Sequence, residues 1–201
     1  MNVLEARLGR GNIKLGPSVP TFSLPSGLTC PGATRWCLKH CYAFRMERLR
    51  GNCRRAFSQN LVLSWHPSRF IDIMVATIPS TASCMRIHVG GDFYARSYVD
   101  AWRTVCENRP QTRFWAYTHS WSVPALLPAL ERLNALANVQ VFASVDPDMP
   151  PPPSGFRLAF VATDPRASGL PCPHQFGSVA SCVECGHCFR ASSGNVIFKV
   201  H

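Results

Sequence analysis

A chain of 201 residues is long enough to bury a hydrophobic core, so it needs no disulfide bonds for stability. No stretch approaches the roughly 20 apolar residues of a membrane-spanning helix, and the amino terminus lacks the charged head and apolar run of a secretory signal. We therefore expect one α/β domain over residues 1–201, cytoplasmic and without membrane contact. In that compartment thiols stay reduced, and clustered cysteines more often bind metal or carry out redox chemistry.

Basic residues outnumber acidic ones by 21 to 11, which gives a formal charge of +10. Such an excess suits nucleic acid or another anionic partner, although solvated arginines in an arginine-rich composition would give the same number. Within one predicted helical region the arginines are concentrated: Arg45, Arg48, Arg50, Arg54 and Arg55. This region predicts a basic surface.

The first half of the chain predicts one strand followed by helices. Glycine and proline interrupt residues 1–29, leaving a single short strand from Val19 to Leu24. Helix-forming residues then predict a helix from Trp36 to about Arg50, ended by Gly51 and Asn52. Further helices are expected over residues 56–63 and 68–78.

In the second half, strands and helices alternate. The expected strands span residues 84–89, 112–117, 139–143, 156–162 and 196–200, and the expected helices span 97–107 and 123–136. This alternation predicts a parallel sheet. Because an eight-unit barrel needs about 250 residues, we expect an incomplete (β/α) TIM-like barrel of five or six mostly parallel strands, with cysteine-rich N- and C-terminal loops.

Polar residues follow the carboxyl ends of four predicted strands. They are Gly90-Gly91-Asp92, Thr118-His119-Ser120, Asp146 and Asp164. In α/β barrels and open α/β sheets this edge carries the site, so the pattern predicts a binding cavity there. Asp92 and His119 are the candidate catalytic residues, and the candidate cofactor-binding residues are Gly90, Gly91, Asp92 and Tyr117. The alternatives are a glycine-rich turn with a capping aspartate, and an aromatic residue that belongs to the core.

Cys30, Cys37 and Cys41, here called the first cysteine group, fall within twelve positions. Cys37 and Cys41 are four residues apart, so on a helix they would share one face. Three thiolates on a [4Fe-4S] cluster would leave one iron open to a substrate. Alternatively, Cys37 and Cys41 bind no metal and are two small hydrophobic side chains that face the core from one helix.

Cys172, Cys182, Cys185 and Cys188 form the second cysteine group. The CxxCxxC spacing of its last three members, on a glycine-containing loop, is typical of iron–sulfur ligands and is sometimes found with zinc. Cys172 would complete a four-thiolate site. We expect a [4Fe-4S] cluster, with zinc as the alternative. The two groups either bind separate metals or contribute to one cluster.

Two families resemble parts of this sequence. Cys37-Leu38-Lys39-His40-Cys41-Tyr42-Ala43, followed by Gly90-Gly91-Asp92, resembles the radical S-adenosylmethionine enzymes, although the third cysteine of their motif would fall at Phe44 and Cys30 would replace it. That resemblance implies a partial barrel with a [4Fe-4S] cluster on the cysteine loop. It also implies S-adenosylmethionine as a ligand, with its methionine amine bound by the turn at Asp92.

The second resemblance covers most of the chain. The segments Thr21-Phe22-Ser23-Leu24-Pro25, Thr29-Cys30-Pro31-Gly32-Ala33, Arg86-Ile87-His88-Val89-Gly90-Gly91-Asp92-Phe93-Tyr94 and Phe114-Trp115-Ala116-Tyr117-Thr118 resemble the gene product eighty-eight family of bacteriophages and plasmids. This implies a mobile-element origin and hence a bacterial host cytoplasm, and says little about activity.

Our leading hypothesis is a phage-type iron–sulfur protein with a [4Fe-4S] cluster over the carboxyl edge of the sheet. Its reaction would be carbon–sulfur bond cleavage in a sulfonium or S-adenosylmethionine-like small molecule. The alternative is a non-catalytic protein, stabilised by zinc or a cluster, that binds nucleic acid through its basic surface or senses redox state. The substrate and the oligomeric state do not follow from the sequence.

Overall fold

A computed structural model describes residues 4–190 and 194–200, and its centre is a seven-stranded sheet with all named strands parallel. The strands are β1 (Thr21–Phe22), β2 (Cys84–Ile87), β3 (Arg113–Thr118), β4 (Val139–Val145), β5 (Arg157–Val161), β6 (Leu170–Pro171) and β7 (Val196–Phe198). Their spatial order is β1-β2-β3-β4-β5-β7-β6. The α/β class and the parallel sheet are confirmed. The expected number of strands was too low because the two-residue strand β6 has no sequence pattern of its own.

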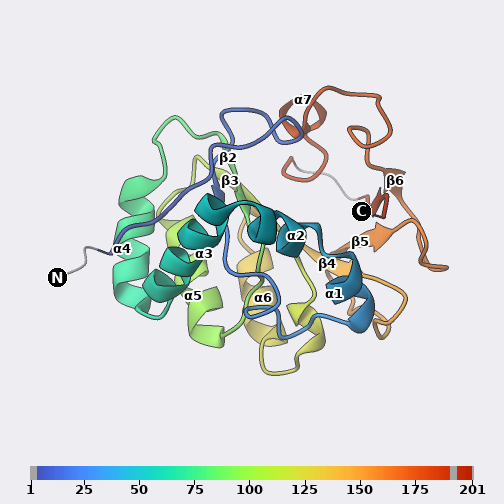
Figure 1. Ribbon diagram of the computed structural model, residues 1–201, viewed down its shortest axis with the longest axis horizontal. Coiled ribbons are helices and arrows are strands. Elements are labelled where there is room, and N and C mark those ends of the chain that lie inside the picture. Colours follow the sequence, from blue (N-terminus) through green and yellow to red (C-terminus); the bar gives the residue numbers. More distant parts are fainter. Residues whose placement is uncertain (1–3, 191–193, 201) are drawn as a thin grey trace.

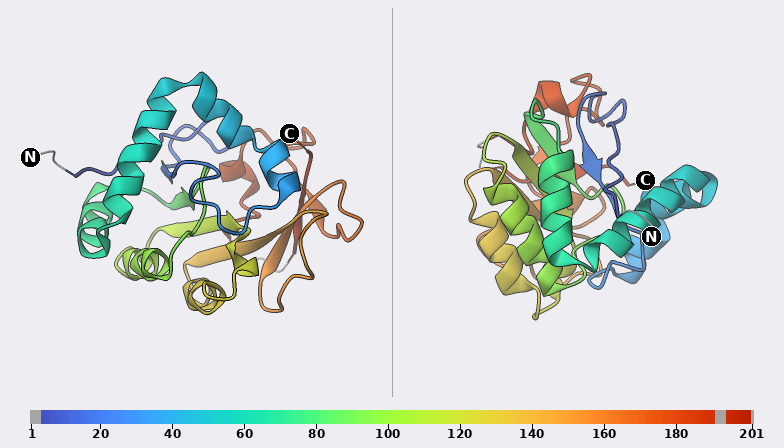
Figure 2. Two further views of the ribbon diagram at one scale, coloured as in Figure 1. Left: turned by 60° about the horizontal axis from the view of Figure 1, so that its bottom comes forward. Right: turned by 90° about the vertical axis from the view of Figure 1, so that its left-hand side faces the viewer.

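Three helices cover one face of this sheet. They are α4 (Pro67–Thr77), α5 (Arg96–Glu107) and α6 (Leu127–Asn134), and Figure 2 shows them side by side in a row along the sheet. The main hydrophobic core lies between the two layers, where Ile87, Phe114 and Val141 of the sheet meet Phe70 and Trp102 of the helices. These side chains are fully buried, and their burial provides most of the hydrophobic stabilisation.

The opposite face of the sheet is covered by irregular segments from both ends of the chain. Successive strand residues point to opposite faces. Trp115 therefore lies away from the helices, where it packs with Leu15 of the N-terminal loop and Phe189 of the C-terminal segment. The Cys182 N–H donates to the Lys14 carbonyl (2.7 Å), which ties the two segments together. Figure 1 shows the blue N-terminal loop beside α7 (Cys182–Cys185).

The helix expected from Trp36 to Arg50 is in fact two helices. α1 spans Arg35–His40 and α2 spans Tyr42–Leu49, with Cys41 in an extended conformation between them. Both helices begin with a side-chain cap: Thr34 accepts the Cys37 N–H, and the Cys41 sulfur accepts the Phe44 N–H. The prediction that Cys37 and Cys41 share one helix face is therefore wrong.

Two other predicted boundaries also differ. α3 spans Gly51–Ser64, so Gly51 begins a helix instead of ending one. A Cβ atom added at Gly51 would meet no atom within 4 Å, so no packing contact depends on this position and glycine is tolerated at the start of the helix. α6 begins four residues later than predicted because a short 3₁₀ turn, Ser120–Ser122, and a further turn precede it. No helix in the described part of the chain combines the length and apolar character needed to cross a membrane.

Candidate functional site

The polar residues at the ends of β2, β3 and β4 form one hydrogen-bonded network, here called the polar edge: Asp92, Thr118, His119 and Asp146. The Thr118 hydroxyl donates to Asp92 Oδ1 (2.5 Å), and the His119 N–H donates to Asp92 Oδ2 (2.9 Å). His119 Nε2 lies 3.1 Å from Asp146 Oδ2. Asp164 does not join them, because it pairs with Arg166 at 2.7 Å. The predicted convergence of strand ends is thus observed for three strands of the four.

Burial and hydrogen bonding set the charges of the polar edge. Burial lowers the pKa of His119, but the hydrogen bonds to Asp146 and Cys37 outweigh it and raise that pKa to about 10. For Asp146, burial raises the pKa, but hydrogen bonds from His119 and Thr34 bring it below its usual value. Burial raises the pKa of Asp92. His119 and Asp146 therefore form an ion pair at neutral pH.

The first cysteine group is fixed directly against this edge. The Thr34 hydroxyl, which caps α1 next to Cys37, donates to Asp146 Oδ2 (2.8 Å). Cys37 Sγ lies 4.0 Å from His119 Nδ1. In the Cys30 turn, the backbone of Gly32 packs so closely on the His119 carbonyl that a Cβ atom would clash with it. The turn after β1 and the end of β3 are therefore held together.

The first cysteine group brings three thiols into one neighbourhood at the turn after β1. Its three thiols lie close enough to influence one another, because Cys37 and Cys41 both raise the pKa of Cys30, after burial and Asp92. A tetrahedral ion would need sulfur atoms about 3.8 Å apart. Within residues 4–190 and 194–200, no three Cys, His, Asp or Glu side chains are placed to hold one metal ion. The cysteines in this part of the chain are all free thiols.

The Gly90-Gly91-Asp92 turn has a packing role in the structure. Gly91 has a φ of +76°, and a Cβ there would lie 2.6 Å from Leu24 Cβ and Thr29 Oγ1. The Asp92 side chain is 4% exposed, and it accepts the Phe93 N–H as well as the two donors named above. A carboxylate has about four acceptor positions, so little capacity remains for a ligand amine. The proposed amine contact of Asp92 stays a prediction.

The second cysteine group surrounds a small cavity on the sheet face opposite the helices. All four of its thiols line this space of about 20 Å³, together with His174 and His187. Burial raises the pKa of Cys188 to about 11, although a hydrogen bond with Tyr117 opposes the shift. The structure thus brings Cys172 to the CxxCxxC segment, as predicted from the sequence.

Arg157 of β5 anchors the second cysteine group to the sheet. Its Nη1 donates to the His187 carbonyl (3.0 Å), its Nη2 lies 2.9 Å from His187 Nε2, and its Nε donates to the Gly194 carbonyl (2.7 Å). The guanidinium also lies 4.4 Å from the centre of the Phe142 ring. His187 is therefore a positioning residue for the adjacent Cys188.

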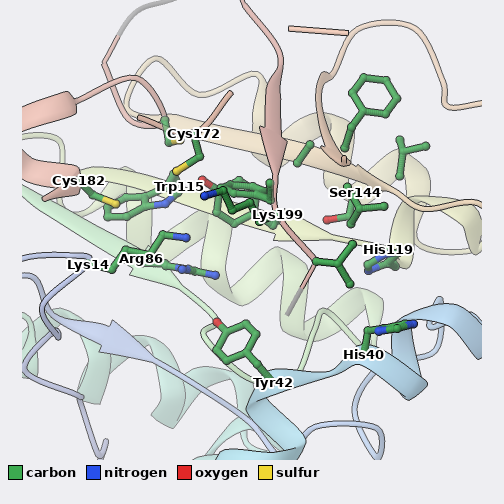
Figure 3. Close-up of a pocket in the computed structure, with 18 of the residues that line it drawn as sticks. Lys14, His40, Tyr42, Arg86, Trp115, His119, Ser144, Cys172, Cys182 and Lys199 are labelled. Carbon is green, nitrogen blue, oxygen red and sulfur yellow. The ribbon is translucent and has the colours of Figure 1, made fainter. Parts of the chain in front are cut away.

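A cavity of about 240 Å³ lies beside the second cysteine group and extends to His119 of the polar edge, and no thiol of the first group lines it (Figure 3). Cys172, Cys182 and Cys188 line one part of it, and His119 lines another, with Trp36 and His40 of α1 nearby. Tyr117 also lines it, and the centre of its ring lies 5.1 Å from that of Phe142, so this residue belongs both to the cavity wall and to the packing of the sheet. Its role in cofactor binding stays a prediction.

Sequence reasoning did not single out Lys14 and Arg86, two basic residues of the cavity wall. Lys14 lies in an irregular loop, and Arg86 lies within a strand whose neighbours Met85 and Ile87 are fully buried. A charged residue in the middle of an apolar strand was the available signal for Arg86. For Lys14 the sequence offered none.

The comparisons with known proteins agree on one family. The Gene product 88 sequence family matches residues 4–191. A "Gene 88 protein" of Mycobacterium phage L5 is 30% identical over 224 aligned positions, covering 94% of this chain and 90% of the phage protein. A "Gene 88 protein" of Mycobacterium phage D29 is 32% identical over 155 positions, covering 69% of this chain and 61% of its own length. No solved structure matches. None of these matches is a radical S-adenosylmethionine enzyme, so that resemblance has no support.

Proposed function

The chain belongs to the Gene product 88 family, and we propose that it is an iron–sulfur protein whose first cysteine group holds a [4Fe-4S] cluster at the carboxyl edge of an incomplete α/β barrel. The observation that carries this proposal is the contact of Cys37, a free thiol, with His119, a residue of the polar edge that also lines the 240 Å³ cavity. Parallel α/β folds place their sites at this edge. When bound, such a cluster supplies an electron or an open iron that acts as a Lewis acid.

The barrel interpretation rests on strand order and on the asymmetry of the two sheet faces. The first five strands follow one another in chain order, as they do around a barrel. The helices α4, α5 and α6 lie on one face, while the other face is closed by loops and by the second cysteine group. An open doubly wound sheet would carry helices on both faces.

The chain's own residues would position the cluster ligands. His119 is held by Asp146 on one ring nitrogen and approaches Cys37 with the other, so it orients this sulfur and stabilises its negative charge. Asp92 fixes the backbone of His119. Both ring nitrogens of His119 are thus engaged, which favours a positioning role over that of a free base.

The second cysteine group would hold a structural metal, either zinc or a second cluster, and its thiols would have to draw closer together to share a single ion. Its four thiols and two histidines surround a space of about 20 Å³, beside a cluster of apolar residues on the sheet face opposite the helices. A closed set of four ligands leaves no position for a substrate. This metal would join the C-terminal segment to the sheet.

The reaction that we propose is cleavage of a carbon–sulfur bond in a sulfonium such as S-adenosylmethionine. In an elimination, the bonding electron pair leaves with the sulfur as a neutral thioether, and a neighbouring carbon loses a proton to a base. In a reductive cleavage, one electron from an external low-potential reductant enters the sulfonium, giving a thioether and a carbon radical.

The test is incubation of anaerobically purified protein with S-adenosylmethionine, with and without dithionite, and analysis of the products. Products without dithionite indicate elimination, and products only with dithionite indicate reductive cleavage. The matched variant is Asp92→Asn, which keeps the shape of the side chain. Turnover should fall in this variant while iron is retained; an iron-loaded wild type without products would reject the reaction.

A second candidate function is nucleic-acid binding by α2 and α3. The five arginines of this region are all exposed, whereas Glu47, the acidic residue of the two helices, is buried and accepts the Ser26 N–H. Binding of RNA or DNA should weaken steeply with salt, and Arg54→Glu combined with Arg55→Glu should reduce it. Binding that is unchanged in this double variant would reject the surface.

A further inference from the structure

We propose that the 240 Å³ cavity binds a small organic anion that carries a planar ring, and that Lys14 and Arg86 hold its anionic group. This site goes beyond the proposed function because it requires no cluster at either cysteine group. The cavity has apolar walls and a few convergent polar groups, the usual composition of a ligand site.

The charge of the wall is one-sided. Lys14, Arg86 and Lys199 line the cavity, together with two histidines, and no aspartate or glutamate is among its described lining residues. Neither Lys14 nor Arg86 takes part in an ion pair within the part of the chain that the structure describes. Both side chains are partly buried, where an unpaired cation is costly, and the nearby Cys182 and Cys188 thiols offset this cost only when they are ionised. A bound anion would offset that cost.

Arg86 is oriented before any ligand arrives. Its Nε donates to the His88 carbonyl (3.0 Å), and its guanidinium lies 5.1 Å from the centre of the Tyr117 ring. These contacts leave the two terminal nitrogens without a described hydrogen-bond partner. Figure 3 shows Lys14 and Arg86 side by side, with their nitrogen ends directed into the cavity. A guanidinium and an ammonium in this arrangement suit a phosphate or a carboxylate.

The remaining walls suit a flat ring. Tyr117 and Phe198 pack edge to face with their ring centres 5.3 Å apart, and Lys14 Nζ lies 4.8 Å from the centre of the Phe198 ring. Trp36 packs against His40 at 4.5 Å, so these rings form an aromatic wall of the cavity. Aromatic side chains stack on planar rings with little dependence on ring identity. The volume lies below the usual range of about 300–1,000 Å³ for ligand pockets, which restricts the ligand to a small molecule.

The positive wall also separates this ligand from a sulfonium. A sulfonium carries a positive charge, which Lys14 and Arg86 would repel. The molecule bound at this end of the cavity would therefore be a second ligand, distinct from any sulfonium near the first cysteine group.

The experiment is calorimetric titration of the full chain, purified without oxygen, with two ring-bearing anions and their neutral counterparts. AMP with adenosine tests a phosphate, and indole-3-acetate with indole tests a carboxylate. We expect at least one anion to bind saturably and its neutral counterpart to bind at least about tenfold more weakly. The pair that responds identifies the anionic group.

Variants separate this site from a role in metal binding. Arg86→Met and Lys14→Met should each weaken the anion at least about tenfold, whereas Arg69→Met, an exposed arginine of α4, should leave affinity unchanged. Circular dichroism confirms folding, and the Lys14 variant serves if the Arg86 variant does not fold. The proposal is overturned if neither anion binds the wild type. It is also overturned if the two cavity variants lose metal but keep the wild-type affinity for the anion.

Discussion

The two cysteine groups present similar thiols in different surroundings. The first lies on a turn and two short helices, against a network of buried polar side chains. The second surrounds a small cavity on the sheet face opposite the helices, where Phe142, Ala159 and Val196 pack around Cys172. One group therefore depends on hydrogen bonds at the end of the sheet, and the other depends on packing and on Arg157.

This difference shows how one ligand type can serve two purposes. In our proposal, the contact of Cys37 with the charged His119 places the first group to act on a ligand, whereas the second group, which also lines part of the 240 Å³ cavity, joins the C-terminal segment to the sheet. If the comparison is correct, substitutions at the polar edge should lower the free energy of unfolding the most. Substitutions around the second group should loosen only the segment near it.

The largest effect on stability should come from Asp92→Ala. The substitution leaves the Phe93 N–H, the Thr118 hydroxyl and the His119 N–H without their acceptor in a buried site. At about 1–3 kcal/mol for each unsatisfied buried group, we expect the free energy of unfolding to fall by about 3 kcal/mol or more. Urea denaturation measures it. The control is Asp148→Ala, which removes an exposed acceptor of the Trp36 N–H and should lower the free energy of unfolding by about 1 kcal/mol. An equal loss of stability in the two variants would contradict the account.

Arg157→Lys should loosen the second cysteine group by about 2 kcal/mol, because lysine cannot make the three contacts of the guanidinium with His187 and Gly194. Hydrogen exchange should accelerate over residues 182–190, while exchange at the polar edge stays the same. Acceleration that spreads equally to β2 and β3 would show that the two regions are not separate.

Acid should weaken the region next to the polar edge through His88. Burial, and then the charge of Arg86, lower the pKa of this histidine to about 3, against about 6.5 in the unfolded chain. Since the unfolded state binds the proton more readily, this contribution to stability is complete above pH 6.5 and decreases as the pH falls toward 3.

We expect a loss of about 1 kcal/mol between pH 6.5 and pH 5.5 from this group. His88→Asn should remove this part of the pH dependence, and asparagine tolerates the φ of +67° at this position. Urea denaturation at both pH values compares the two proteins. An identical acid dependence in the variant would assign the effect to other groups.

The smallest effect should come from Cys53→Ala. Cys53 lies partly exposed on α3, belongs to neither cysteine group and lines neither cavity. Metal content should not change, and the free energy of unfolding should change by less than about 0.5 kcal/mol. A loss of metal in this variant would show that the assignment of cysteines to two groups is incomplete.

Periodicity and strand-end residues predicted much of this architecture. The β2–α5–β3 segment was predicted within a few residues, and the convergence of Asp92, His119 and Asp146 followed from their positions after parallel strands. The break at Cys41 was not predictable from helix propensity, because there the cysteine sulfur caps the second helix by accepting the Phe44 N–H.

The cavity wall was also beyond sequence reasoning. Lys14 reaches the cavity because its loop is hydrogen-bonded to Cys182, 168 positions away in the chain. β6 owes its position to pairing with β7, and its two residues are exposed. Contacts between distant segments decided both features, and neither leaves a local pattern.

The most direct test of the central claim is the metal content of anaerobically purified protein. Iron, sulfide and zinc per chain, with the visible spectrum, would be compared between the wild type, Cys37→Ala and Cys185→Ala. We predict at least about four irons with broad visible absorbance in the wild type; Cys37→Ala should lose about four of them, and Cys185→Ala should keep these four whether the second group holds zinc or a second cluster. Zinc without iron in the wild type, or full iron in Cys37→Ala, would contradict a cluster at the first cysteine group.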